Sequence, residues 1–224
     1  MLRAVIFDMD GVIVDSEPLH VKAERQTLAP YGVEVAEKEM QGYMGRTPKI
    51  LLRELIKRYR LDAALETIYT SHKMNLLTLY QNEVEPIPGA LGLICDLVRE
   101  GKDLALASSS DNDLISVVLD KFCLSPSFNV VVSGEEVVRV KPYPDIFLEA
   151  TRRLGYDSRE CIVIEDSQAG VRASKSAGIP CVGFRSPHSK NQDLSEAEII
   201  IDDLREIDTK GLEMLLDGIP WMSR

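Results

Sequence analysis

Histidine and cysteine are scarce in this chain of 224 residues. The 3 histidines lie too far apart in the sequence to indicate a zinc site. The 4 cysteines form no close pair and no metal-ligand spacing (Cys95, Cys123, Cys161 and Cys181). We therefore interpret them as reduced, mostly buried thiols of a cytoplasmic protein.

Basic charge and long apolar runs are also limited. The 26 lysines and arginines are outnumbered by 36 acidic residues, and the net charge is −10. Nucleic acids and anionic membranes select for basic surfaces, so neither is expected as the main partner. No apolar run approaches the roughly 20 residues of a membrane helix, and we expect no basic leader before the first strand. The 45% hydrophobic content suits one core, or a core with a small second domain.

The first apolar stretch ends in two acids. Residues 4–7 read as a short strand buried on both faces, followed by Asp8, Met9, Asp10 and Gly11. If the strand continued, Asp8 and Asp10 would lie on the same side of it. Two crowded carboxylates repel each other, so their presence favours a bound cation or a reaction that uses them. An ordinary acidic turn is the alternative.

The remaining pattern divides the chain into a helical stretch and an alternating one. Residues 16–85 carry helical patterns, with Ser16 expected to cap the first helix and Gly32 expected near its end. From residue 86 onward, predicted helices (90–99, 111–122, 145–154, 169–176) alternate with predicted strands (104–107, 130–132, 161–164, 181–184, 199–201). This predicts an α/β fold, a doubly wound parallel sheet with a Rossmann-like core. We expect a catalytic core of residues 1–15 and 86–224 and an inserted helical cap of residues 16–85.

Three further polar stretches follow predicted strands. They are Ser108-Ser109-Ser110, Lys141 between Val140 and Pro142, and Glu165-Asp166-Ser167. Carboxyl ends of parallel strands meet at one edge of the sheet, so we expect these side chains beside Asp8 and Asp10. Serines before a helix suit an anion, a lysine suits a phosphoryl group, and carboxylates suit Mg²⁺. Taken singly, helix caps, a solvated lysine and an acidic turn stay open as alternatives.

In this order, these residues resemble the haloacid dehalogenase-like hydrolases. The resemblance spans nearly the whole chain and is to the phosphatase branch with a helical cap, which includes β-phosphoglucomutases and sugar-phosphate phosphatases. It rests on Asp8-Met9-Asp10-Gly11-Val12, Ser108, Lys141-Pro142-Tyr143-Pro144-Asp145 and Glu165-Asp166-Ser167. The second acid, Asp10, distinguishes this pattern from that of the dehalogenases and favours phosphoryl transfer.

The resemblance implies a role for each matched residue. Asp8 would be the nucleophile that forms an aspartyl-phosphate, and Asp10 the general acid and base. Mg²⁺ would be held by Asp8, the Asp10 backbone carbonyl and Asp166, with Glu165 assisting. Ser108, the Ser109 backbone and Lys141 would hold the phosphoryl oxygens. The implied activity is hydrolysis of a small phosphorylated metabolite, a sugar phosphate. We expect the protein to be a monomer.

The substrate and the choice between phosphatase and mutase depend on less specific residues. His20, Lys73, Ser110 and Asn112 match positions that the mutases use, whereas Met44 stands where the mutases have a cap lysine. Arg46 is a candidate for substrate phosphate or an ordinary surface arginine. We favour a phosphatase, with β-phosphoglucomutase as the alternative. A phosphoacceptor signalling domain and a catalytically silent relative also stay open.

Overall fold

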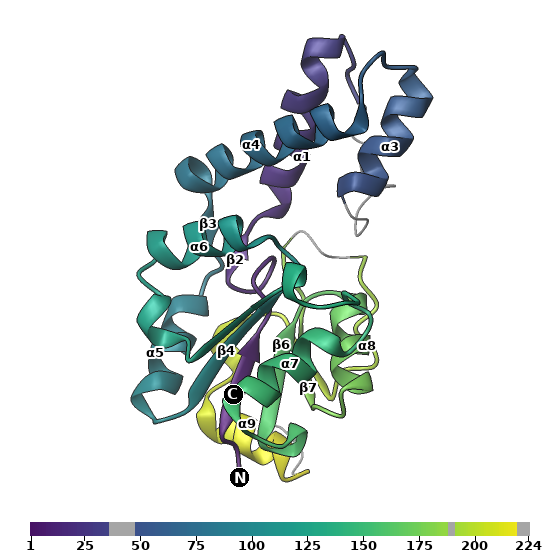
Figure 1. Cartoon of the computed structure of the whole chain (residues 1–224). Coiled ribbons are helices and arrows are strands. Elements are labelled where there is room, and N and C mark those ends of the chain that lie inside the picture. Colours follow the sequence, from purple (N-terminus) through teal and green to yellow (C-terminus); the bar gives the residue numbers. More distant parts are fainter. Residues whose placement is uncertain (36–47, 188–190, 219–224) are drawn as a thin grey trace. The chain divides into compact units, whose positions relative to one another are not determined.

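The computed structural model describes residues 1–35, 48–187 and 191–218, and the prediction for Arg46 lies outside these ranges. The chain forms two compact units, one of Met1–Asp15 with Glu85–Arg224 and the other of Ser16–Val84 (Figure 1). The first is an α/β unit and the second is helical. No helix of the described ranges is both long enough and apolar enough to cross a membrane.

The α/β unit contains a parallel sheet of six strands in the order β5-β4-β1-β6-β7-β8. Its strands are β1 (Ala4–Phe7), β4 (Asp103–Ser108), β5 (Val130–Ser133), β6 (Cys161–Glu165), β7 (Cys181–Phe184) and β8 (Ile199–Ile201). The α-helices of this unit are α5 (Ala90–Arg99), α6 (Asn112–Lys121), α7 (Asp145–Leu154), α8 (Gln168–Ser176) and α9 (Thr209–Leu216). Short 3₁₀ turns cover Ser125–Ser127, Gly134–Glu136, Ser158–Glu160 and Leu204–Glu206. The predicted α/β fold with a parallel sheet is confirmed.

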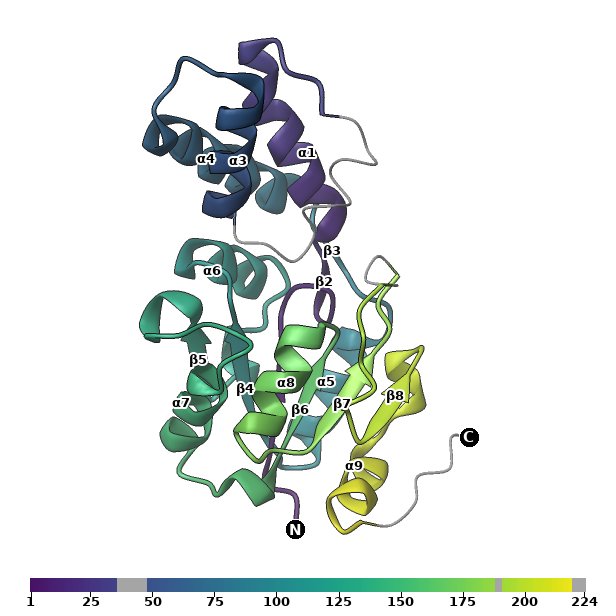
Figure 2. The ribbon, with the colours of Figure 1, turned by 90° about the vertical axis from the view of Figure 1, so that its right-hand side faces the viewer.

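The sheet is buried on both faces by helices. All four residues of β1 are fully buried, as expected for a central parallel strand. Alternate residues such as Ile6 and Val163 pack with α7 and α8 in one core cluster, because neighbouring strand side chains point to opposite faces. Figure 2 shows α7 and α8 in front of the sheet and α5 behind it. This packing holds the carboxyl ends of the central strands rigidly side by side.

A small antiparallel ribbon carries the chain out of the α/β unit and back. β2 (Val14–Asp15) pairs with β3 (Glu85–Pro86), with Asp15 opposite Glu85. Both ends of the helical insertion are therefore adjacent in the ribbon.

The helical unit contains α1 (Glu17–Leu28), a 3₁₀ turn (Ala29–Tyr31), α3 (Pro48–Tyr59) and α4 (Leu65–Glu83). α1 packs along α4, and Lys22 pairs with Glu83 at 2.7 Å between them. Leu28, Leu51 and Leu55 belong to a buried apolar cluster of this unit. That the unit works as a cap on the active site stays a prediction.

Two local expectations need correction. Ser16 stands at the N-cap position of α1, but its side chain makes no capping hydrogen bond, because its backbone is helical rather than extended. Only Cys161 and Cys181 are buried, because they begin the central strands β6 and β7. Cys95 on α5 and Cys123 in the turn after α6 are exposed. Gly32, with a φ of 69°, closes the 3₁₀ turn after α1, near the predicted end of that helix.

Candidate active site

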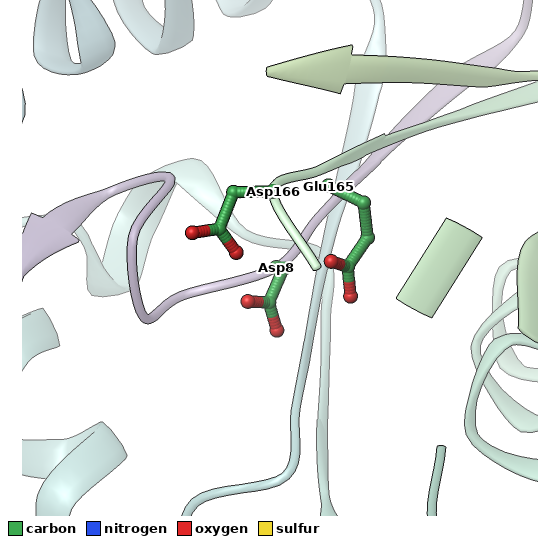
Figure 3. Close-up of side chains that lie close together, drawn as sticks. All are labelled: Asp8, Glu165 and Asp166. Atoms are coloured by element: carbon green, nitrogen blue, oxygen red, sulfur yellow. The ribbon is translucent and has the colours of Figure 1, made fainter. Parts of the chain in front are cut away.

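Three buried carboxylates meet at the carboxyl ends of β1 and β6. Asp8 follows β1 directly, Glu165 is the last residue of β6, and Asp166 comes next. One oxygen from each lies within 4.8 Å of the others, and the three residues are 7%, 0% and 7% exposed. Figure 3 shows their side chains next to one another. The register explains this meeting, because Phe7 lies opposite Ile164 in adjacent parallel strands.

The ammonium group of Lys141 lies between two of these acids. Its Nζ donates to Asp8 Oδ1 at 2.6 Å, to Glu165 Oε1 at 2.7 Å and to the Ala107 carbonyl at 3.0 Å. The lysine side chain is 6% exposed, and Nζ lies 5.0 Å from the centre of the Phe147 ring. Lys141 is therefore held in one position by strand ends on both sides of β1.

Burial and charge act in opposite directions on this pair. Burial raises the pKa of Asp8 well above its ordinary value; Lys141 opposes that rise, while Glu165, Asp10 and Asp166 add to it. Burial alone would lower the pKa of Lys141. The charges of Asp8 and Glu165 outweigh this effect, and the pKa of Lys141 lies above its ordinary value. The cluster thus combines three acids with one ammonium group, which contacts Asp8 and Glu165.

Glu165 is fixed through both of its oxygens. Oε1 accepts from Lys141, and Oε2 accepts from the backbone N–H and the hydroxyl of Ser167, each at 2.9 Å. The Ser167 hydroxyl also accepts from the Gly170 N–H at 3.0 Å and so caps α8. A Cβ on Gly170 would overlap the Glu165 carboxylate. This glycine therefore leaves the space that Glu165 needs to reach Lys141.

Asp10 joins the site through a sharp turn rather than through an extended strand. β1 ends at Phe7, and the chain turns at Gly11, whose φ is 81°. Asp10 Oδ2 accepts from the hydroxyl of Ser110 at 2.6 Å and from that of Ser108 at 3.4 Å. The expectation that both acids lie in one site agrees with these contacts, although the backbone between them is not extended.

The serines after β4 hold one another. The Ser110 N–H donates to the Ser108 hydroxyl at 3.0 Å, and the Ser133 hydroxyl donates to the Ser110 carbonyl at 2.8 Å. Ser108 and Ser133 are fully buried, whereas Ser109 is exposed. The serine segment is thus fixed from two strands, and its roles in phosphate binding stay predictions.

Three further predicted residues lie on helices, Asn112 on α6 of the α/β unit and His20 and Lys73 on α1 and α4 of the helical unit. Asn112 donates through its backbone and side-chain nitrogens to Glu135 Oε2, at 3.0 and 2.9 Å. In the helical unit, His20 Nε2 and the Tyr80 hydroxyl share a hydrogen bond of 3.2 Å, and Lys73 is half-buried on α4. These contacts leave the proposed substrate roles of His20, Lys73 and Asn112 untested.

Sequence reasoning missed Ser186 and the role of Gly170. The buried Ser186 hydroxyl donates to Asp166 Oδ2 at 2.9 Å. Ser186 lies 20 residues after Asp166, beyond β7, so no local pattern pointed to it. Gly170 offered a weak signal, since a glycine in the first turn of a helix is unfavourable and needs a reason.

The acidic cluster has the chemistry of a magnesium site. Mg²⁺ prefers carboxylate and carbonyl oxygens with water, and the clustered groups here are carboxylates. Burial and the neighbouring acids raise the pKa of Asp8, and a bound divalent cation would oppose that rise by stabilising the carboxylate. Asp8 and Asp166, each from a different strand end, fit this ion.

Comparisons with known proteins give the same family from sequence and from structure. The model of the haloacid dehalogenase-like hydrolases matches residues 5–184. Hexitol phosphatase B of Escherichia coli is 28% identical over 227 residues, covering 94% of this chain and 96% of that enzyme. The bifunctional riboflavin kinase/FMN phosphatase of Arabidopsis thaliana is 31% identical over 208 residues, covering 91% of this chain.

The crystal structure of CbbY from Rhodobacter sphaeroides in complex with phosphate superposes with a TM-score of 0.86 at 26% identity, covering 95% of this chain and 100% of that one. The chain spans only 54% of the length of the Arabidopsis kinase/phosphatase and 18% of another Arabidopsis relative. The matched region nevertheless includes Asp8 and Asp166 at the ends of β1 and β6 and Lys141 in the loop before α7. The chain belongs to the haloacid dehalogenase-like hydrolases.

Proposed function

We propose that the chain is a Mg²⁺-dependent phosphatase that hydrolyses small phosphorylated metabolites, with sugar phosphates as the substrate class. The observation that carries this proposal is the position of Lys141, which binds both Asp8 and Glu165. Asp10 accepts a hydrogen bond from Ser110 in the same site. A buried nucleophilic carboxylate, a second acid and a fixed ammonium group are the parts that phosphoryl transfer needs. The phosphatases named among the relatives support the same reaction class.

In the first step, Asp8 would attack the phosphorus atom of the substrate. The bond from phosphorus to the alcohol oxygen breaks, and an aspartyl-phosphate forms on Asp8. Asp10, in its protonated form, gives its proton to the departing alcohol oxygen. Lys141, Ser108 and the Ser109 backbone would hold the phosphoryl oxygens during the transfer.

In the second step, Asp10 would act as a base. It takes a proton from a water molecule whose oxygen bonds to phosphorus, and the bond between phosphorus and Asp8 breaks. Inorganic phosphate leaves, and both aspartates return to their starting forms. The Ser110 hydroxyl, 2.6 Å from Asp10 Oδ2, would keep this carboxyl group in place between the two steps.

Mg²⁺ held by Asp8, the Asp10 carbonyl and Asp166, with Glu165 assisting, would offset the repulsion between the nucleophile and an anionic phosphate. Glu165 already accepts hydrogen bonds on both oxygens, which supports a main role in holding Lys141. We propose that the helical unit, Ser16–Val84, selects the substrate. His20, Lys73 and Arg46 are its candidate contacts.

The test is phosphate release from a panel of hexose, pentose and hexitol phosphates with Mg²⁺. β-Glucose 1-phosphate with a bisphosphate primer is assayed in parallel for glucose 6-phosphate. Phosphate release that is lost in Asp8→Asn would support the proposal. Formation of glucose 6-phosphate with little free phosphate would instead identify a mutase, and wild-type activity in Asp8→Asn would exclude Asp8 as the nucleophile.

Two contacts favour the phosphatase over the mutase. Ser110 and Asn112, which match mutase positions, already bind Asp10 and Glu135 of the chain itself. A second phosphate at these residues would have to replace those hydrogen bonds.

A further inference from the structure

Ser186 contacts the active site from the segment after β7, a strand that carries none of the predicted residues. β7 pairs with β6, with Gly183 opposite Glu165, so the segment after β7 lies next to Asp166. The Ser186 hydroxyl donates to Asp166 Oδ2 at 2.9 Å, and the two residues are 4% and 7% exposed. This hydrogen bond is therefore shielded from competing water.

The backbone holds Ser186 in this position. The Ser186 N–H donates to the Phe184 carbonyl at 3.1 Å, which makes a tight turn directly after β7. The Arg185 N–H donates to the Ile201 carbonyl at 2.9 Å and ties the turn to β8. The turn thus carries the hydroxyl back toward β6 from a fixed point on the sheet.

Asp166 is also confined by Gly11. A Cβ on Gly11 would overlap Asp166 Oδ2, and the φ of 81° at Gly11 is one that other residues rarely adopt. The same oxygen therefore lies against the Gly11 backbone and accepts from Ser186. Fixing one oxygen of a carboxylate limits rotation of the group and so sets the direction of the other oxygen.

We propose that Ser186 is a positioning residue that holds Asp166 in the orientation required to bind the metal ion. This inference rests on the metal site of the proposed function. Groups that orient metal ligands typically change metal affinity by about 10- to 100-fold when they are removed. Because the Ser186 hydroxyl binds Asp166 through one of its two oxygens, we expect an effect near the lower end.

The test is calorimetric titration of the whole chain with MgCl₂ in the absence of any substrate. Ser186→Ala should raise the dissociation constant about 10-fold, and Ser186→Thr, which keeps the hydroxyl, should stay close to wild type. Ser174→Ala is the matched control, because Ser174 is also a buried serine whose hydroxyl donates a hydrogen bond. Its acceptor is the Ile179 carbonyl in the turn after α8, at 2.8 Å. The control should lower thermal stability without changing Mg²⁺ affinity.

The outcomes separate this inference from the proposed function. An unchanged dissociation constant in Ser186→Ala would overturn the positioning role, even if stability falls as in Ser174→Ala. Equal loss in Ser186→Ala and Ser186→Thr would also overturn it, because the hydroxyl would not be the cause. Failure of Asp166→Ala to weaken Mg²⁺ binding, or no binding to wild type, would overturn the metal site itself. Absence of phosphatase activity alone would leave the affinity comparison intact.

Discussion

Replacement of Lys141 by methionine should destabilise the α/β unit much more than removal of the acid it binds. Lys141 pairs with Asp8 at 2.6 Å and Glu165 at 2.7 Å, and its side chain is 6% exposed. Methionine has a similar volume but leaves the buried carboxylates without their counter-charge. Breaking a buried ion pair from one side typically costs about 3–5 kcal/mol. We expect Lys141→Met to lower the free energy of unfolding by that amount.

Asp8→Asn should behave differently. Burial raises the pKa of Asp8, which means that its charged form is unfavourable in the folded protein even with Lys141 beside it. The substitution removes one of several crowded negative charges, and Lys141 keeps Glu165 as a partner. We expect the free energy of unfolding to change by less than about 1 kcal/mol, within the range of mild substitutions.

The assay is urea unfolding followed by circular dichroism, with EDTA to remove divalent ions. Arg159→Met is the control, because the pair of Arg159 with Asp157 has side chains 86% and 55% exposed. Surface pairs contribute about 0–1 kcal/mol, so this variant should resemble wild type. A Lys141→Met protein as stable as wild type, or an Asp8→Asn protein as unstable as Lys141→Met, would refute the reasoning.

Three further predictions concern other parts of the molecule. Burial, with the charge of Glu17, raises the pKa of Glu24 from 4.5 to about 8, so the folded helical unit keeps a proton that the unfolded chain releases. The free energy of unfolding should fall as pH rises toward 8 and level off above it. Glu24→Gln should remove this slope and raise the free energy of unfolding at pH 9 by a few kcal/mol, measured by hydrogen exchange of α1. Gly170→Ala should displace Glu165, loosen Lys141 and lower kcat at least 10-fold, with the displacement visible in a crystal structure. Deletion of Ser16–Val84, closed by a short glycine linker between Asp15 and Glu85, should leave a folded α/β unit by circular dichroism, because those two residues are paired in the ribbon.

Each of these expectations has an opposite result. An unchanged pH slope in Glu24→Gln, measured between pH 6.5 and 9, would show that Glu24 is ionised in the folded protein. Most of this range lies above the pH at which His72 contributes, because burial and the charge of His20 lower the pKa of His72 from 6.5 to about 4. A Gly170→Ala protein with wild-type kcat would mean that Glu165 needs no fixed position. An unfolded deletion variant would show that the helical unit stabilises the sheet.

The strands and the edge at which the acids meet were predictable because they depend on local patterns. The buried run before Asp8 and the apolar run before Glu165 each form a central strand. Parallel pairing then brings the strand ends together, whatever the details of the loops. Side-chain pairing was harder to predict, because Lys141 lies 133 residues from Asp8 and its bond to Glu165 depends on where the loop before α7 meets the end of β6.

The sequence by itself determined the class of fold and the acids available for chemistry, because short apolar runs, helical apolar patterns and strand-end polar residues are local properties. Only the tertiary structure decided which partner each acid has. Lys141 binds Asp8, Ser110 holds Asp10 and Ser186 holds Asp166. In the sequence, Ser186 is marked by no pattern and Gly170 only by its place in a predicted helix. They matter here for two reasons of packing. The pairing of β6 with β7 places the Ser186 hydroxyl beside Asp166, and Glu165 leaves no room for a side chain at residue 170 of α8.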